Sequence, residues 1–127
     1  MPAAGTRMSS SRIWVSGSPR VIDAGKVADR TLGDNPHVWY DPAVVHKVAA
    51  VVTDSLQERA PNASGYFAGR ATKWDHAMAP YDAAIEQLRS SASGRAYAAT
   101  ESVLDPMAAA PGLTDVTPAG YRRAAAN

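Results

Sequence analysis

The sequence predicts an α/β chain dominated by two helices, at residues 41–59 and 62–91, followed by a short strand at 95–100. Apolar residues recur at spacings of three and four in both helical segments, which places them along one face of a helix. Pro61 separates the two helices, and Gly94 ends the second. The run after Gly94, RAYAAT, is short, mostly apolar and bounded by turn signals, as expected for a short buried strand.

The first helix has a clear start signal. Asp41 is a good N-cap, because its carboxylate can accept hydrogen bonds from the free amides of the first turn. Pro42 suits the first helical position, where no N–H is needed. The helix should bury a single apolar stripe, formed by Val45, Val48, Val52 and Leu56.

The second helix carries an apolar seam whose spacings alternate between four and three without a break. Its members are Phe67, Ala71, Trp74, Met78, Tyr81, Ile85 and Leu88. A seam of this length predicts one long helix packed along its side. Pro80 lies inside it and removes one backbone hydrogen bond, so we expect a kinked helix rather than two separate ones.

The remaining elements are short. Residues 21–23 could form a strand and residues 24–32 one helical turn, followed by a turn at Gly33-Asp34. After the strand at 95–100, a short helix is expected at 102–110, with Asp105-Pro106 at its start. A further strand at 115–117 and a helix from residue 118 complete the chain.

The composition excludes several classes of protein. The 127 residues are 46% hydrophobic and 20% charged, with a net charge of +1, which argues against disorder and against a nucleic-acid-binding surface. No apolar run approaches the roughly 18 residues that span a membrane. Cysteine is absent, so any metal must be held by His, Asp or Glu. The first residues lack the pattern of a signal peptide.

The segment Asn35-Pro36-His37-Val38-Trp39-Tyr40-Asp41-Pro42 places one histidine on a constrained loop. Pro36 keeps Asn35 out of the helical region and makes the approach extended. His37 then lies four residues ahead of the helix cap. Loops of this kind carry binding residues more often than buried elements do, so His37 is a candidate ligand.

These eight residues resemble the NPH-x-W-x-DP signature of the substrate-binding proteins of metal ABC transporters, in the zinc- and manganese-binding cluster (cluster A-I, ZnuA-like). The resemblance implies a two-lobed solute-binding fold, of which this chain would be an internal fragment. Residues 20–61 would end the first lobe, 62–92 would form the connecting helix, and 93–127 would begin the second lobe. Residues 1–19 do not follow the family and read as a flexible lead of unassigned, foreign or mistaken origin.

In the family, the motif histidine is a metal ligand, which implies that role for His37. A second imidazole usually follows the first strand of the second lobe, and here Glu101 stands at the matching place. Zn²⁺ accepts carboxylate oxygen as a ligand, and a carboxylate makes the site harder, which shifts preference toward Mn²⁺. A site needs about four ligands, so the resemblance implies further ligands outside this chain and only weak binding by the chain alone.

The implied function is the capture of Zn²⁺ or Mn²⁺ outside the cytoplasm, in the periplasm or at the cell surface, for delivery to an ABC permease. The partners would be that permease and the missing lobes of the parent, with no nucleic acid. No H-E-x-x-H or comparable pair indicates a metal hydrolase, so no enzyme is predicted. The alternative is a helical interaction or structural fragment that uses the long seam as a partner surface.

The other candidate residues have simpler interpretations. His46 and His76 lie on the two helices and are expected to be solvated. Trp39 and Trp74 are expected to pack in the core or between lobes. Glu101 itself could serve only as a negative charge at the start of a helix, which the helix dipole favours.

Overall fold

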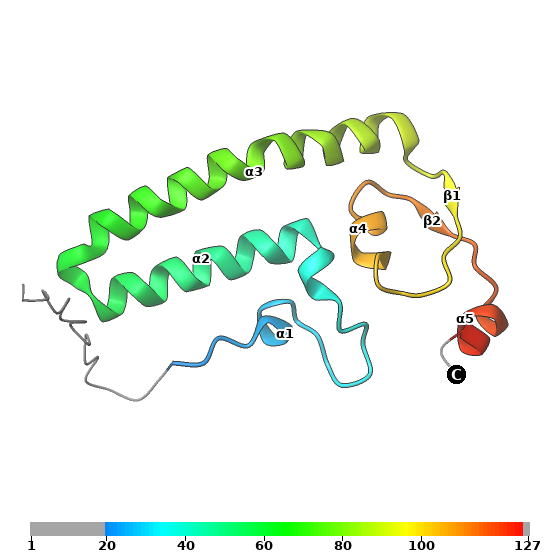
Figure 1. Cartoon of the computed structure of the whole chain (residues 1–127), viewed down its shortest axis with the longest axis horizontal. Helices are drawn as coiled ribbons and strands as arrows, with labels where there is room; N and C mark the ends of the chain where they lie inside the picture. Colours follow the sequence, from blue (N-terminus) through cyan, green and yellow to red (C-terminus); the bar gives the residue numbers. More distant parts are fainter. Residues whose placement is uncertain (1–19, 126–127) are drawn as a thin grey trace, which may run out of the picture.

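The computed structural model describes residues 20–125, with residues 123–125 described by their backbone alone. The elements in chain order are α1 (Ala24–Val27), the 3₁₀ helix η1 (Val38–Tyr40), α2 (Pro42–Arg59), the 3₁₀ helix η2 (Pro61–Ala63), α3 (Ser64–Ala92), β1 (Ala96–Tyr97), α4 (Asp105–Ala109), β2 (Thr114–Asp115) and α5 (Ala119–Ala125). Helices α2 and α3 form an antiparallel hairpin, and β1, α4 and β2 gather near the C-terminal end of α3 (Figure 1). The expected lead at 1–19 lies outside the described residues.

Helix α2 begins as the sequence predicts. The Asp41 carboxylate accepts hydrogen bonds from the backbone amides of Ala43 and Val44, at 2.9 and 3.3 Å. Pro42 occupies the first turn, where its missing N–H leaves no hydrogen bond unmade. This cap fixes the residue at which α2 starts, and therefore where the loop that carries His37 ends.

The expected stripe on α2 is partly wrong. Val52 and Leu56 are exposed, whereas Val44 and Ser55 are the buried residues of this helix. Valines occupy two neighbouring lines of α2, so periodicity alone does not decide which line faces the interior. The packing partners decide it, because α1 and η1 cover one side of α2 while α3 covers another.

Helix α3 is one long helix of 29 residues that continues through Pro80. It curves along its length (Figure 1). Six members of the predicted seam are buried or half-buried, with Ile85 the most buried, and only Leu88 is exposed. The spacing therefore identified the face of α3 that packs against the rest of the chain.

The elements after α3 are shorter than expected. Strands β1 and β2 form a parallel pair, with Ala96 opposite Thr114 and Tyr97 opposite Asp115. The expected strand at 95–100 ends at Tyr97, because the amide of Ala99 donates to the Thr117 hydroxyl at 2.9 Å instead of extending the ladder. The expected strand at 21–23 is also wrong, since Asp23 is the N-cap of α1.

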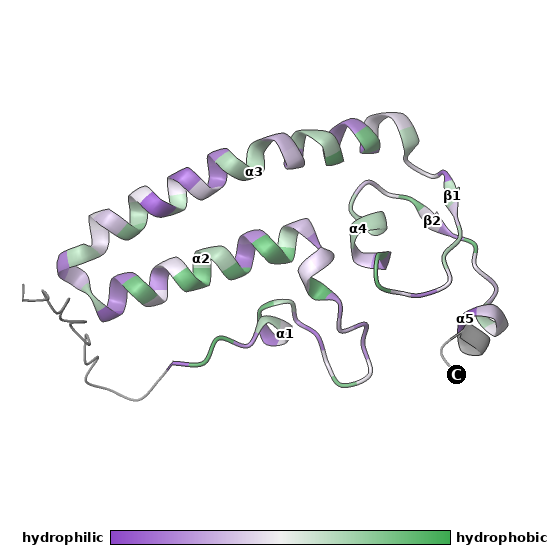
Figure 2. Cartoon of the chain, viewed as in Figure 1, coloured by the Kyte–Doolittle hydropathy of each residue, from purple (hydrophilic) through white to green (hydrophobic). Residues whose placement is uncertain are grey.

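The buried core is small. Among the described residues, the buried hydrophobic side chains are Val38, Val44 and Ile85, and Pro111 is fully buried in the C-terminal part. The expectation that Trp39 packs in the core is wrong, because Trp39 is 59% exposed. Hydrophobic and hydrophilic residues alternate along both long helices (Figure 2). No helix within the described range is long and apolar enough to cross a membrane.

Candidate metal-binding loops

The loop that carries His37 is anchored on both sides of the histidine. Asp41 caps α2 four residues later, and Val38 is 94% buried, since only 6% of it is exposed. The short helix η1, which starts at Val38, packs against both α2 and α4. The loop is therefore held at the junction between the helical hairpin and the C-terminal part of the chain.

The side-chain amide of Asn35 sets the tautomer of the neutral His37 ring. Its oxygen accepts the backbone N–H of His37 at 3.0 Å, and its NH₂ group donates to the carbonyl of Ser102 at 2.7 Å. A backbone N–H only donates and a backbone carbonyl only accepts, so these partners identify the oxygen end of the amide. That oxygen also lies 2.7 Å from His37 Nδ1, which must then carry the proton.

The neutral His37 ring therefore presents its lone pair at Nε2. An imidazole binds a metal through a nitrogen without a proton, and the hydrogen bond of the other nitrogen sets which one that is. Nε2 has no hydrogen-bond partner within residues 20–125. The ring is half-buried and meets Trp39 edge-on, with centroids 5.3 Å apart. This arrangement orients one ring nitrogen for a ligand.

Glu101 lies in the loop between β1 and α4, not at the end of a strand as expected, and its side chain is exposed. The loop is closed by a hydrogen bond from the Tyr97 hydroxyl to Oδ1 of Asp105, at 2.9 Å. The Asp105 amide donates to the Ser102 carbonyl at 3.2 Å. Glu101 is thus presented by a short segment whose two ends are tied together.

A charged cluster holds the base of this loop. Arg122 donates to both carboxylate oxygens of Asp105 and also contacts Asp115, at 2.7 Å. The hydrogen bonds from Arg122 hold the pKa of Asp105 below its ordinary value, and burial opposes the effect. Burial and the Asp105 carboxylate raise the pKa of the Tyr97 hydroxyl. The cluster joins α5, α4 and both strands.

The structure places the two predicted ligands on loops that touch. The Asn35–Ser102 hydrogen bond joins a residue two positions before His37 to the residue directly after Glu101. Whether the two side chains share one metal stays a prediction. No group of three or more His, Asp or Glu side chains is arranged to hold a metal ion in the described part of the chain.

Sequence reasoning missed two contacts. The sequence marks Asn35 only as the residue before a proline, and no local pattern signals its partner 67 residues away. His46 was expected to be solvated, yet its Nε2 lies 3.0 Å from Oδ1 of Asp82 and its ring meets Trp74 edge-on. His46 therefore belongs to the α2–α3 contact, while His76 is exposed as expected.

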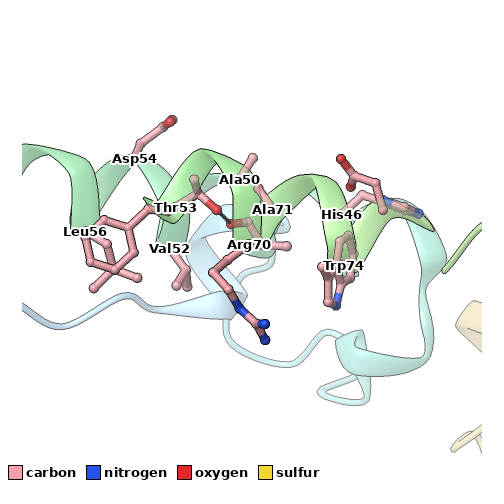
Figure 3. Close-up of a pocket in the computed structure, with 12 residues that line it drawn as sticks. His46, Ala50, Val52, Thr53, Asp54, Leu56, Arg70, Ala71 and Trp74 are labelled. Carbon is pink, nitrogen blue, oxygen red and sulfur yellow. Dashed lines mark hydrogen bonds between the residues drawn. The ribbon is translucent and has the colours of Figure 1, made fainter. Parts of the chain in front are cut away.

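An apolar groove runs between α2 and α3. It encloses about 550 Å³ and is open along its side. Figure 3 shows His46 and Trp74 near one end and Leu56 near the other, with Arg70 extending from α3. The groove contains neither His37 nor Glu101, so it is distinct from the candidate metal-binding loops.

Comparison with protein families identifies the family of this chain. The model of the ZnuA family, described as "zinc-uptake complex component A periplasmic", matches residues 5–126. The match covers nearly all of the chain. It begins at residue 5, whereas we expected the family resemblance to begin at Arg20. Searches of curated proteins and of solved structures returned no significant match.

Proposed function

This chain belongs to the family of the periplasmic component A of zinc-uptake complexes, and from that premise we propose that it contributes His37 and Glu101 to a site that captures Zn²⁺ or Mn²⁺ for transport. The family supports a role as a metal-binding solute-binding component of an ABC transporter. The residues, the choice of metal and the completeness of the site are the proposal.

The orientation of His37 is the observation that carries the proposal. The side-chain oxygen of Asn35 accepts a hydrogen bond from Nδ1–H at 2.7 Å, which leaves Nε2 as the nitrogen with a lone pair. Metal-binding histidines are usually oriented in this way, by a hydrogen bond from the nitrogen that does not bind the metal. A histidine that served only for solubility would not need one amide oxygen to hold both its backbone N–H and its ring.

Glu101 would supply an oxygen ligand from the second loop. The Asn35–Ser102 hydrogen bond brings the two loops into contact, which favours a shared site. Imidazole suits Zn²⁺, whereas a carboxylate ligand suits Mn²⁺ as well. The remaining ligands of a site of about four would come from residues beyond this sequence, and the chain alone would bind metal weakly.

The proposal assigns residues 20–61 to the end of the first lobe, 62–92 to the connecting helix and 93–127 to the start of the second lobe. The bound ion would be released to a membrane permease on the outer side of the membrane. No chemical reaction is proposed, because the role of such a component is capture and delivery.

The test is a titration with Zn²⁺ and with Mn²⁺. Calorimetry measures the affinity, and NMR of the histidine ring nitrogens identifies the ligand. His37→Ala should lower the affinity at least about tenfold, the loss that removal of even an outer partner of a ligand causes. His76→Ala is the matched control, because His76 is an exposed histidine of α3. An equal loss in both variants would remove the main support for the proposal.

The groove between α2 and α3 favours a second candidate, a helical interaction module. Val52, Leu56 and Trp74 line this open apolar surface. A metal titration separates the two candidates. If the chain were only an interaction module, the wild type and His37→Ala would bind Zn²⁺ with the same affinity.

A further inference from the structure

We propose that Asn35 is the positioning residue of the metal site, where its side-chain amide orients His37 with one end and holds the loop that presents Glu101 with the other. The inference rests on the proposed function of His37 and Glu101. It adds a residue that binds no metal itself and acts on both ligands at once.

The oxygen of Asn35 performs the first task. It accepts from the backbone amide of His37 at 3.0 Å and from Nδ1 of the same residue at 2.7 Å. The two bonds hold the backbone and the ring of His37 against a single atom. The ring then has one orientation and one tautomer, with the lone pair on Nε2.

The NH₂ group performs the second task. It donates to the carbonyl of Ser102, at 2.7 Å, directly after Glu101. The other hydrogen bonds that join the 98–104 segment to the rest of the chain have Asp105, Ala108 and Thr117 as their partners, all of them after the segment in the sequence. Among the described residues, Asn35 supplies the one hydrogen bond to this segment from the chain before α3.

The two tasks require both an acceptor and a donor, which only an amide side chain of this length combines. Aspartate would keep the acceptor for His37 but would place an oxygen against the Ser102 carbonyl. Alanine would lose both. Asn35→Asp and Asn35→Ala therefore separate the two tasks, and Asn62→Asp, at an exposed asparagine of η2, controls for the added charge.

Two readouts test the proposal in the whole chain. The first is the tautomer of His37, read from its ring nitrogen chemical shifts at a pH where the ring is neutral. The wild type and Asn35→Asp should have the proton on Nδ1, and Asn35→Ala should shift toward the proton on Nε2. A wild-type ring with its proton on Nε2 would overturn the proposal even if Asn35→Ala failed to fold.

The second readout is the hydrogen exchange rate of the Asp105 amide, which donates to the same Ser102 carbonyl. It should rise about fivefold in both Asn35 variants, the factor that corresponds to one neutral hydrogen bond, and stay unchanged in Asn62→Asp. Unchanged exchange in Asn35→Asp would overturn the second task. Addition of Zn²⁺ to the wild type keeps the two hypotheses apart: if no His37 resonance moved, the metal site would fail while the tautomer and exchange results still decided the role of Asn35.

Discussion

The hydroxyl of Tyr97 donates to Oδ1 of Asp105 at 2.9 Å and so joins the two ends of the segment that carries Glu101. Tyr97 ends β1 and Asp105 begins α4. The same carboxylate accepts from Arg122 of α5. One acidic side chain therefore links a strand, two helices and the loop between them.

Removal of the Tyr97 hydroxyl should loosen this loop. We expect Tyr97→Phe to lower the free energy of unfolding by about 1 kcal/mol, the usual net contribution of one hydrogen bond. The exchange of the Ala99 amide, which donates to Thr117, should become faster. Tyr66→Phe is the control, because Tyr66 is 67% exposed. Equal effects of the two changes in chemical denaturation would show that the Asp105 contact contributes nothing.

Acid should weaken the same cluster. Hydrogen bonds from Arg122 hold the pKa of Asp105 below its ordinary value of 3.8, so the folded state binds fewer protons than the unfolded state. The contribution of Asp105 to stability is then complete above about pH 3.8 and is lost as pH falls through the lower, folded pKa. Asp115 acts in the same direction, because the Thr117 side chain and amide lower its pKa.

The measurement is chemical denaturation at a series of pH values from 6 downward. Asp105→Asn should be less stable than the wild type near neutral pH, and the difference should shrink in acid. Asp75→Asn, on an exposed part of α3, provides the control with the same change of side chain. A difference that stayed constant with pH would mean that the ionised form of Asp105 is not what stabilises the cluster.

The parts of the fold that the sequence predicted are those governed by neighbouring residues. The Asp41 cap, the Pro42 position and the long seam of α3 depend on spacings of a few residues, and the structure confirms them. The same local logic placed α4 at Asp105-Pro106. The continuity of α3 through Pro80 is likewise confirmed, because the seam on both sides of the proline requires one helix; a kink at Pro80 stays a prediction.

The parts that the sequence missed depend on contacts between distant residues. The buried line of α2 is set by α1, η1 and α3 rather than by the spacing of its valines. The contacts of Asn35 with Ser102 and of His46 with Asp82 join residues 67 and 36 positions apart. His37 could be identified from its motif, whereas the residue that orients it required the tertiary structure.

The α3 seam gives a direct test of the packing. Ile85 is 92% buried, since only 8% of it is exposed, whereas Leu88 is 46% exposed on the same helix. Ile85→Ala should cost about 2–4 kcal/mol of stability, because it removes buried methyl groups and leaves a cavity. Leu88→Ala should cost less than about 1 kcal/mol. Similar losses for both, measured by urea denaturation, would contradict the burial pattern.

The helix cap before the hairpin can be tested in the same way. Asp41 accepts from the amides of Ala43 and Val44, so Asp41→Ala should cost about 1 kcal/mol. Asp41→Asn keeps an oxygen acceptor and should recover most of that loss. Because asparagine keeps an acceptor for the amides of Ala43 and Val44, the hydrogen exchange of these two amides should rise only in the alanine variant. A loss in Asp41→Asn as large as in Asp41→Ala would rule out the capping role.

The choice of metal should depend on the second ligand. If Glu101 binds the ion together with His37, Glu101→His would exchange an oxygen ligand for an imidazole, which suits Zn²⁺ better than Mn²⁺. We expect the ratio of Zn²⁺ to Mn²⁺ affinity to rise by roughly tenfold, equivalent to about 1.4 kcal/mol.

Competition titrations of both metals against the wild type, Glu101→His and Glu101→Gln measure this ratio. Glu101→Gln is the control for size, because it keeps the length of the side chain but removes its charge and should weaken both metals. A Glu101 that binds no metal would leave the Zn²⁺ to Mn²⁺ ratio the same in all three proteins. In that case His37 alone would remain as the candidate ligand, and the exposed carboxylate between β1 and α4 would serve only as a negative charge ahead of a helix.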